Sequence, residues 1–174
     1  MQSEERNAIW LRLMEQYRGA LGRLAQSYEF DAGAREDLLQ EIGLGIWKAI
    51  PAFRGEASER TWLYRIAHNV AISAAVSRNR RKSREMELPE TAQPESAAEP
   101  LDRALVRQQQ RDAMLAAIRE LPAIDRQLMV LHLEGLSYRE IEQVSGMTEG
   151  AIATRLSRIR DRLTARIREK EAWK

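Results

Sequence analysis

The chain has 174 residues, of which 44% are hydrophobic and 31% charged, and its formal net charge is +2. This composition is ordinary for a soluble protein with one domain or two small ones, and so small a net charge says little about partners. Because the sequence contains no cysteine, disulfides, cysteine-based zinc sites and direct thiol sensing are excluded. The two histidines, His68 and His132, lie far apart without HExxH spacing, so we expect no metal and no cofactor.

The amino-terminal residues MQSEERN are polar and acidic, and no apolar run approaches the length of a membrane span. We therefore expect a cytoplasmic protein with no membrane insertion of its own. Charge is arranged in blocks: a basic run at 78–84, an acidic stretch without a base at 85–102, and a mostly basic tail at 155–174. Such alternation suggests surfaces for different partners.

Helical periodicity predominates along the chain, and strand signals are nearly absent. Apolar residues recur at steps of three and four over residues 10–28, which predicts a first long helix. A second predicted helix ends at Pro51, and Ser58 can cap a third. The buried stripe of this third helix is expected to consist of Trp62, Leu63, Ile66, Val70 and Ala74. We expect the three helices to pack as a compact bundle over residues 1–82.

Residues 83–103 form a predicted linker rich in proline, glutamate and small residues. Such a segment cannot bury enough apolar surface to offset its ordering entropy, so we expect a flexible tether. Periodicity then resumes, with predicted helices through Ile118 and over residues 125–133. The predicted fold class is therefore all-α, with two small helical domains joined by the linker and the second domain at residues 104–174.

The stretch SYREIEQVSGMTEGAIATRLSRIR, residues 137–160, predicts a helix–turn–helix within the second domain. Ser137 and Glu140 form a capping box, which marks the start of a helix. Gly146 supplies the backbone freedom for a sharp turn, and Thr148 can cap the next helix. The buried stripe of that helix is expected to be Ile152, Leu156, Ile159 and Leu163.

The opposite face of this last helix combines small residues with arginines. A helix that enters the major groove needs small residues near base edges and arginines near guanine acceptors or phosphates. The alternative is a solvated amphipathic helix, which two capped helices joined by a glycine turn disfavour. The candidate DNA-binding residues are Glu149, Ala151, Thr154, Arg155, Ser157, Arg158 and Arg160. Arg155 and Arg158 are the leading candidates for base or phosphate contacts, whereas Arg160 lies nearer the flank.

Two sequence blocks together resemble a known family. AREDLLQEIGLGIWKAIPAFRGEASERTWLYRIAHNVAISAAVSRNRR is similar to the N-terminal domain of extracytoplasmic-function (ECF) sigma factors of the sigma-70 family. LPAIDRQLMVLHLEGLSYREIEQVSGMTEGAIATRLSRIRDRL is similar to their promoter-reading C-terminal domain. The resemblance implies a bacterial protein that binds core RNA polymerase, directs it to promoter DNA and is not an enzyme. It further implies that the helix–turn–helix reads the minus-35 element and that an anti-sigma factor holds the protein inactive until a stress signal.

The resemblance also implies two surfaces in the first domain. In the family, the segment matching D-L-x-Q-E docks on a coiled coil of the largest polymerase subunit. The polymerase-binding candidates are Glu36, Asp37, Gln40, Glu41 and Trp47. The third helix and the loop before it read the minus-10 element in the family, where a basic groove and amides suit single-stranded DNA. The minus-10 candidates are Arg60, Arg65, Asn69, Arg78, Arg80 and Arg81.

Both surfaces have simpler alternatives. The acidic residues could be a solvated helix start, and the arginine run could complement the end of a helix dipole.

Glu59 stands where the family usually has an apolar residue. Gly43 and Gly45 replace bulkier residues at a cost of about 1 kcal/mol of helix stability each, for a reason the sequence does not supply.

Trp62 is expected in the core, and His68 at the surface or at a groove edge. The acidic linker suggests a stand-in for RNA phosphates in the path of the nascent transcript. An alternative function is a stand-alone dimeric helix–turn–helix regulator, which would bind a palindromic duplex tightly without polymerase.

Overall fold

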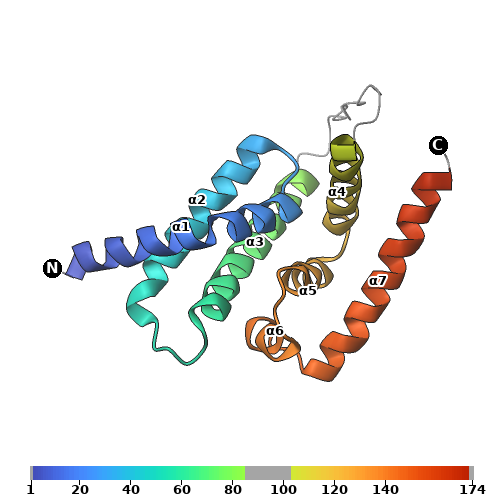
Figure 1. The fold of residues 1–174 in the computed structure, drawn as a ribbon. Helices are drawn as coiled ribbons and strands as arrows, with labels where there is room; N and C mark the ends of the chain where they lie inside the picture. Colours follow the sequence, from blue (N-terminus) through green and yellow to red (C-terminus); the bar gives the residue numbers. More distant parts are fainter. Residues whose placement is uncertain (1, 85–102, 173–174) are drawn as a thin grey trace.

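The computed structural model describes residues 2–84 and 103–172 (Figure 1). Within these ranges the chain forms α-helices, one 3₁₀ turn and no strand, so the predicted all-α fold class is confirmed. The elements are α1 (Gln2–Tyr28), α2 (Ala32–Ala49), η1 (Ile50–Ala52), α3 (Glu59–Arg84), α4 (Arg103–Arg119), α5 (Ala123–Leu133), α6 (Tyr138–Ser145) and α7 (Glu149–Ala172). The two ends of the predicted linker are helical, and its acidic part at 85–102 lies outside the described residues.

The N-terminal domain is a bundle of α1, α2 and α3, as expected. The Asp31 carboxylate caps α2 by accepting a hydrogen bond from the Ala34 N–H at 2.9 Å. The Ser58 hydroxyl accepts one from the Thr61 N–H at 3.1 Å, which confirms the predicted start of α3. Trp62 is buried against Phe53, with ring centroids 4.7 Å apart, so its expected core role is confirmed.

Gly43 and Gly45 allow α2 to approach α1 on one side and α3 on the other. A Cβ atom at Gly43 would lie 3.5 Å from atoms of Trp10 and Met14, and one at Gly45 would lie 3.1 Å from Cγ2 of Val70. The indole N–H of Trp10 also donates a hydrogen bond to the Gly43 carbonyl at 2.8 Å. Both glycines therefore have a packing role inside the N-terminal domain.

The expected position of His68 at the surface or a groove edge is wrong. Its side chain is 0% exposed and lies on the face of α3 that packs against α1. Its Nδ1 atom hydrogen-bonds with the Tyr28 hydroxyl at 3.2 Å. Burial lowers the pKa of His68 to about 3, so the imidazole is neutral at ordinary pH. The partner that makes this burial tolerable lies forty residues away in the sequence, beyond the reach of local periodicity.

The C-terminal domain consists of α4, α5, α6 and α7. The predicted buried stripe of α7 is confirmed, because Ile152, Leu156, Ile159 and Leu163 are all buried. Their partners are apolar residues of the shorter helices, among them Leu128, Leu131 and Ile141. This packing leaves the opposite face of α7 in solvent.

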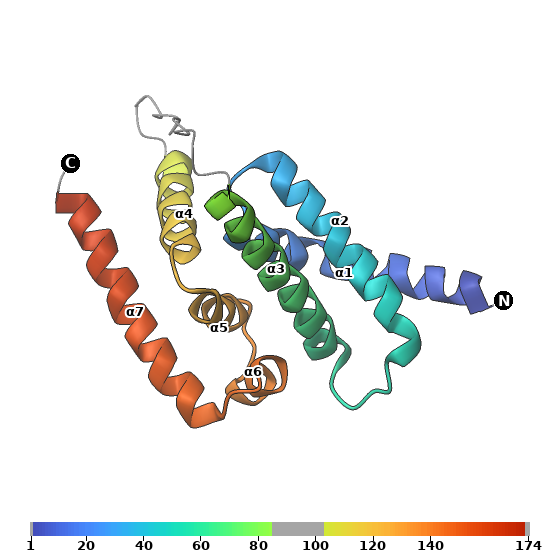
Figure 2. The ribbon, with the colours of Figure 1, turned by 180° about the vertical axis from the view of Figure 1, so that it is seen from behind.

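The two domains lie against one another, with α6 beside α3 and α4 beside α1 (Figure 2). Buried apolar residues of both domains join into one cluster. The sequence predicts two modules on a tether and does not predict this interface, because its contacts join residues far apart in the chain. No helix in the described ranges has the length and apolar character needed to span a bilayer.

Candidate nucleic-acid interface

The helix–turn–helix consists of α6 and α7, and local hydrogen bonds fix where each helix begins. The Ser137 hydroxyl accepts a hydrogen bond from the Glu140 N–H at 3.3 Å, and the Glu140 carboxylate accepts one from the Ser137 N–H at 2.8 Å. The predicted capping box is thus confirmed. Gly146 ends α6 with a φ of 73°, in the left-handed region that favours glycine. Thr148 precedes α7, and its hydroxyl accepts a 3.4 Å hydrogen bond from the Ala151 N–H.

The first turns of α7 present an open face with little bulk. A Cβ atom at Gly150 would meet nothing within 4 Å, and the neighbouring Ala151 and Thr154 are exposed. A shallow pocket of about 620 Å³ lies on this face and is also lined by Arg155, Arg158 and Arg162. Of the predicted DNA-binding residues, the exposed ones are Glu149, Ala151, Thr154, Ser157, Arg158 and Arg160. The structure therefore brings small residues and cations together on one accessible surface.

Arg155 differs from its neighbours because it is half-buried and already engaged. Its Nε atom donates a hydrogen bond to Oδ1 of Asp125 at 2.5 Å. Nη1 of Arg162 lies 3.4 Å from the other carboxylate oxygen of Asp125. Arg158 forms no ion pair within the part of the chain that the structure describes. The two leading candidates from the sequence thus have different surroundings.

The candidate minus-10 residues lie along α3 but do not form one open surface. Arg65 and Asn69 are exposed. Nη2 of Arg60 donates to the backbone carbonyl of Glu134, so the C-terminal domain covers it. Arg78 forms an ion pair with Glu29, at the end of α1. The remaining two candidates, Arg80 and Arg81, belong to α3, and their side chains lie outside the described residues.

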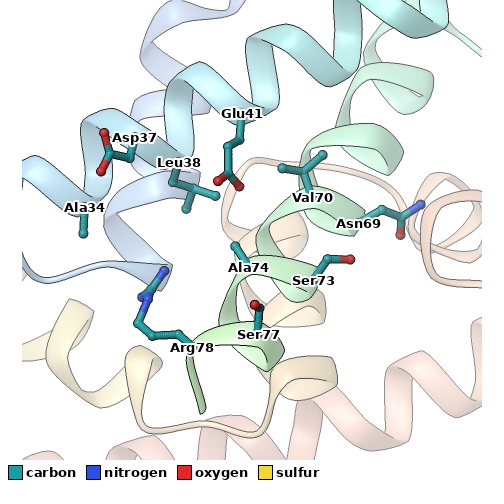
Figure 3. Close-up of a pocket in the computed structure, with 10 residues that line it drawn as sticks. All are labelled: Ala34, Asp37, Leu38, Glu41, Asn69, Val70, Ser73, Ala74, Ser77 and Arg78. Atoms are coloured by element: carbon teal, nitrogen blue, oxygen red, sulfur yellow. The ribbon is translucent and has the colours of Figure 1, made fainter. Parts of the chain in front are cut away.

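A groove of about 630 Å³ runs between α2 and α3 (Figure 3). Asp37 and Glu41 line it from α2, and Asn69 and Arg78 line it from α3. Its floor carries short side chains such as Ala74. The groove therefore links the candidate polymerase-binding residues to the candidate minus-10 residues.

The candidate polymerase-binding residues separate into an exposed set and a packed one. The exposed set lies on the outer face of α2 and consists of Glu36, Asp37, Gln40 and Glu41. Trp47 is half-buried, with the Arg6 guanidinium 3.4 Å above its ring. The Trp47 indole N–H also donates to the Asn7 side chain at 2.9 Å. Trp47 therefore packs α2 against α1, and only part of its ring remains accessible.

Sequence reasoning missed three residues that the structure places at these surfaces. Leu44 is 51% exposed and follows Gln40 and Glu41 by one helical turn, so the same periodicity could have identified it. Asp125 has no local signal, because its partners Arg155 and Arg162 are thirty and thirty-seven residues away. Glu134 likewise has no local signal, since its partners belong to the other domain.

Glu134 is the polar centre of the contact between the domains. Its carboxylate accepts hydrogen bonds from Nε of Arg23 at 2.6 Å and from the Tyr64 hydroxyl at 3.0 Å. Burial by itself would raise the pKa of Glu134, but the bonds from Arg23 and Tyr64 hold that pKa below its usual value. The carboxylate is therefore charged at neutral pH and ties α5 to both α1 and α3.

Two stretches of the chain match known families. Residues 13–81 match the family described as Sigma-70 region 2, and residues 111–163 match Sigma-70, region 4. The chain is 28% identical over 163 residues to the ECF RNA polymerase sigma-E factor of Escherichia coli strain K12, covering 89% of this chain and 84% of the relative. The chain belongs to the ECF group of the sigma-70 family. The two matched stretches of this sigma factor include all of α2, η1, α5 and α6. They include only parts of α1, α3, α4 and α7.

Other relatives agree with the assignment. The sigma factor is 29% identical over 168 residues to the RNA polymerase sigma-H factor of Pseudomonas aeruginosa, covering 92% of this chain and 86% of the relative. Its fold resembles CnrH solved in complex with the cytosolic domain of CnrY, with a TM-score of 0.67 at 19% identity, over 96% of this chain and 95% of CnrH. It also resembles the sigma factor RpoE of Bartonella quintana solved with the anti-sigma factor NepR, with a TM-score of 0.68 at 24% identity, over 90% and 95% of the two chains. At these identities the two structures support the fold.

Proposed function

We propose that this sigma factor binds core RNA polymerase and directs it to promoters that carry two separate recognition elements. In this proposal the α6–α7 unit reads the minus-35 element as duplex, and α3 reads the minus-10 element as single strand. The chain itself catalyses no reaction and works in the cytoplasm. The observation that carries the proposal is the open face of α7, where small residues and arginines lie together at the start of a helix capped by Thr148.

The minus-35 part of the proposal follows from the shape and charge of α7. Close approach to base edges requires a face without bulk, which Gly150, Ala151 and Thr154 provide. Arg158 is exposed and without an ion pair in the described residues, so its guanidinium is available to a guanine or a phosphate. Ser157 and Arg160 lie beside it and suit backbone contacts, which orient the protein without specifying sequence.

The minus-10 part rests on the exposed polar residues of α3. The Asn69 amide can pair with the edge of an unstacked base, and Arg65 can contact its phosphate or stack on its ring. Arg60 belongs to the same surface but is covered by the backbone of Glu134. Full access to the minus-10 surface therefore requires the C-terminal domain to move away, and we propose that polymerase binding causes this separation.

Polymerase docking is assigned to the exposed acidic face of α2. Glu36, Asp37, Gln40 and Glu41 present four polar side chains on this face, and Leu44 adds an exposed apolar side chain one turn further along α2. Acidic groups that meet a basic partner accelerate association and make it salt-sensitive. Trp47 contributes by holding α2 against α1 and through the accessible part of its ring.

We also propose that an anti-sigma factor binds where the two domains meet. The solved relatives were captured with CnrY and with the anti-sigma factor NepR. In this chain an apolar groove of about 220 Å³ lies between α1, α4 and α5. Its apolar lining consists of Met114, Leu115, Ile118, Val130 and Leu133. An apolar segment bound there would hold the domains together and keep Arg60 covered.

Association of the labelled sigma factor with core RNA polymerase tests the proposal. We expect tight, salt-sensitive binding, and we expect Glu41→Lys to weaken it by roughly tenfold. Glu15→Lys makes the same charge change on an exposed part of α1 and is the matched control. The proposal is wrong if the wild-type chain does not bind the core enzyme, or if it binds a palindromic duplex tightly as a dimer without polymerase.

A further inference from the structure

Asp125 is a buried carboxylate in the first turn of α5 that reaches the recognition helix. Its side chain is 6% exposed, and it contacts two arginines of α7. Arg155 and Arg162 are seven residues apart, so they lie two turns apart on the same face of α7. The sequence motifs and the family assignment leave this carboxylate without a role.

The contact between Asp125 and Arg155 has a particular geometry. Oδ1 of Asp125 accepts the hydrogen bond from Nε of Arg155, at 2.5 Å. Nη1 and Nη2 of Arg155 make no hydrogen bond within the described part of the chain, and 43% of the side chain remains exposed. The carboxylate thus restrains the side of the guanidinium and leaves its outer edge available.

A guanidinium held in this way is suited to one kind of contact. Guanine presents O6 and N7 side by side in the major groove, and a guanidinium binds both through two parallel N–H groups. A free arginine loses side-chain entropy when it is held in that geometry, whereas a restrained one has already lost most of it. The pocket on the same face is lined by Gly150 and Ala151, which leave room for a base edge.

We infer that Asp125 is a positioning residue that orients Arg155 for the recognition of one guanine in the minus-35 element. This inference rests on the proposed function and assigns a specificity-determining pair to the α6–α7 unit. Arg162 is the second partner of the carboxylate, at the longer distance of 3.4 Å, and it lies further from the start of the helix. A purely structural tie between α5 and α7 would instead affect stability and leave base preference unchanged.

The test is transcription by core polymerase with this sigma factor from a promoter library randomised over the minus-35 element. We expect transcripts made with the wild-type sigma factor to favour guanine at one position of the element. Asp125→Asn should reduce this preference for guanine by roughly tenfold. Arg155→Ala should lose the same preference, and adding Asp125→Asn to it should cause no further loss. This non-additivity is the signature of a residue that acts through another.

Glu120→Gln is the matched control. It also removes one carboxylate that pairs with an α7 arginine, Arg166, but the Glu120 side chain is 40% exposed, whereas that of Asp125 is 6% exposed. We expect its base preferences to equal those of the wild type. Thermal unfolding of each variant reports its folding separately, and Arg155→Ala keeps the inference testable if Asp125→Asn does not fold.

Three results would overturn the inference: unchanged base preferences in Asp125→Asn, a uniform loss at every position, or retention of the guanine preference in Arg155→Ala. Failure of the proposed function is distinct from these, because the wild-type chain would then give no sequence-specific transcripts at all.

Discussion

His68 lies on the core face of α3, where its only described hydrogen bond joins Nδ1 to the Tyr28 hydroxyl. Burial lowers the pKa of its imidazole from 6.5 to about 3 in the folded chain. Between these two values the unfolded chain binds the proton and the folded chain does not. The free energy of unfolding therefore falls as the pH decreases through this window and is fully retained above it.

We expect the wild-type protein to lose about 1 kcal/mol of unfolding free energy between about pH 7.5 and about pH 5.5 through this residue. His68→Gln removes the titration while keeping a hydrogen-bond acceptor for Tyr28, so it should lack this component. Urea unfolding followed by circular dichroism at the two pH values measures the difference. His132→Gln, which replaces the other histidine of the chain, is the matched control variant. Identical losses in wild type and His68→Gln would contradict the account.

Within α2, Gly43 and Gly45 both lower the stability of the helix, but each allows a close approach to a different neighbouring helix. Gly43 faces α1 at a distance that a methyl group would fill by ordinary contact. A Cβ atom at Gly45 would lie 3.1 Å from Cγ2 of Val70 in α3, a tight contact that requires Val70 to give by a few tenths of an ångström. Because valine in a helix has one strongly preferred rotamer, Val70 cannot easily turn away. The two positions should therefore respond differently to the same substitution.

Gly43→Ala should raise the free energy of unfolding by up to about 1 kcal/mol, because alanine favours the helix. Gly45→Ala should gain less or destabilise the domain, since the same gain is opposed by the clash with Val70. Chemical denaturation of both variants provides the comparison. Adding Val70→Ala should relieve the clash and make Gly45→Ala less unfavourable than it is in the wild-type background. Equal effects of the two glycine substitutions would argue against this explanation.

The elements that were predictable from the sequence are those with local signals. Ser58, the Ser137–Glu140 capping box and Gly146 mark helix ends through contacts within four residues, and the structure has helices at those places. The buried stripe of α7 follows from helical periodicity in the same way. The face of α7 opposite to it, which carries most of the candidate minus-35 residues, was therefore also predictable.

The contacts that were not predictable join distant residues. The hydrogen bond between Tyr28 and His68 and the pairing of Asp125 with Arg155 cross forty and thirty residues of sequence. In each case a polar group is tolerated in a buried place because another helix supplies its partner, and periodicity carries no information about that helix. The packing of Trp47 on α1 was unpredictable for the same reason, because Arg6 and Asn7 lie about forty residues away in the sequence.

At the scale of the whole molecule, the structure shows the two domains in contact. Glu134 joins them, because its carboxylate binds Arg23 and Tyr64 and its carbonyl accepts from Arg60. The hydrogen bonds from Arg23 and Tyr64 lower the pKa of Glu134 below its ordinary value of 4.5. They therefore stabilise the contact between the domains above pH 4.5, and this stabilisation is lost as the pH falls through the lowered pKa. The contact covers Arg60, one of the candidate minus-10 residues, so its strength should influence how readily the proposed minus-10 surface becomes accessible to DNA.

We expect Glu134→Gln to loosen the contact between the domains and to increase the average distance between them. The chain has no cysteine, so cysteines introduced at the exposed positions Arg18 and Gln143 can carry a fluorescent pair for single-molecule energy transfer. Glu59→Gln breaks an ion pair with Arg12 inside the N-terminal domain and is the control that should not change the distance. Superimposable distributions for wild type and Glu134→Gln would show that this carboxylate does not hold the domains together.

In the proposed function, one chain reads two separate promoter elements while polymerase holds both. The decisive experiment is run-off transcription with purified core polymerase on a fully randomised promoter library. We expect transcripts only when the sigma factor is added, from templates that share two sequence blocks at a fixed spacing, with Arg158→Ala altering the upstream block alone. Transcripts without shared blocks, or a single palindromic block bound without polymerase, would contradict it.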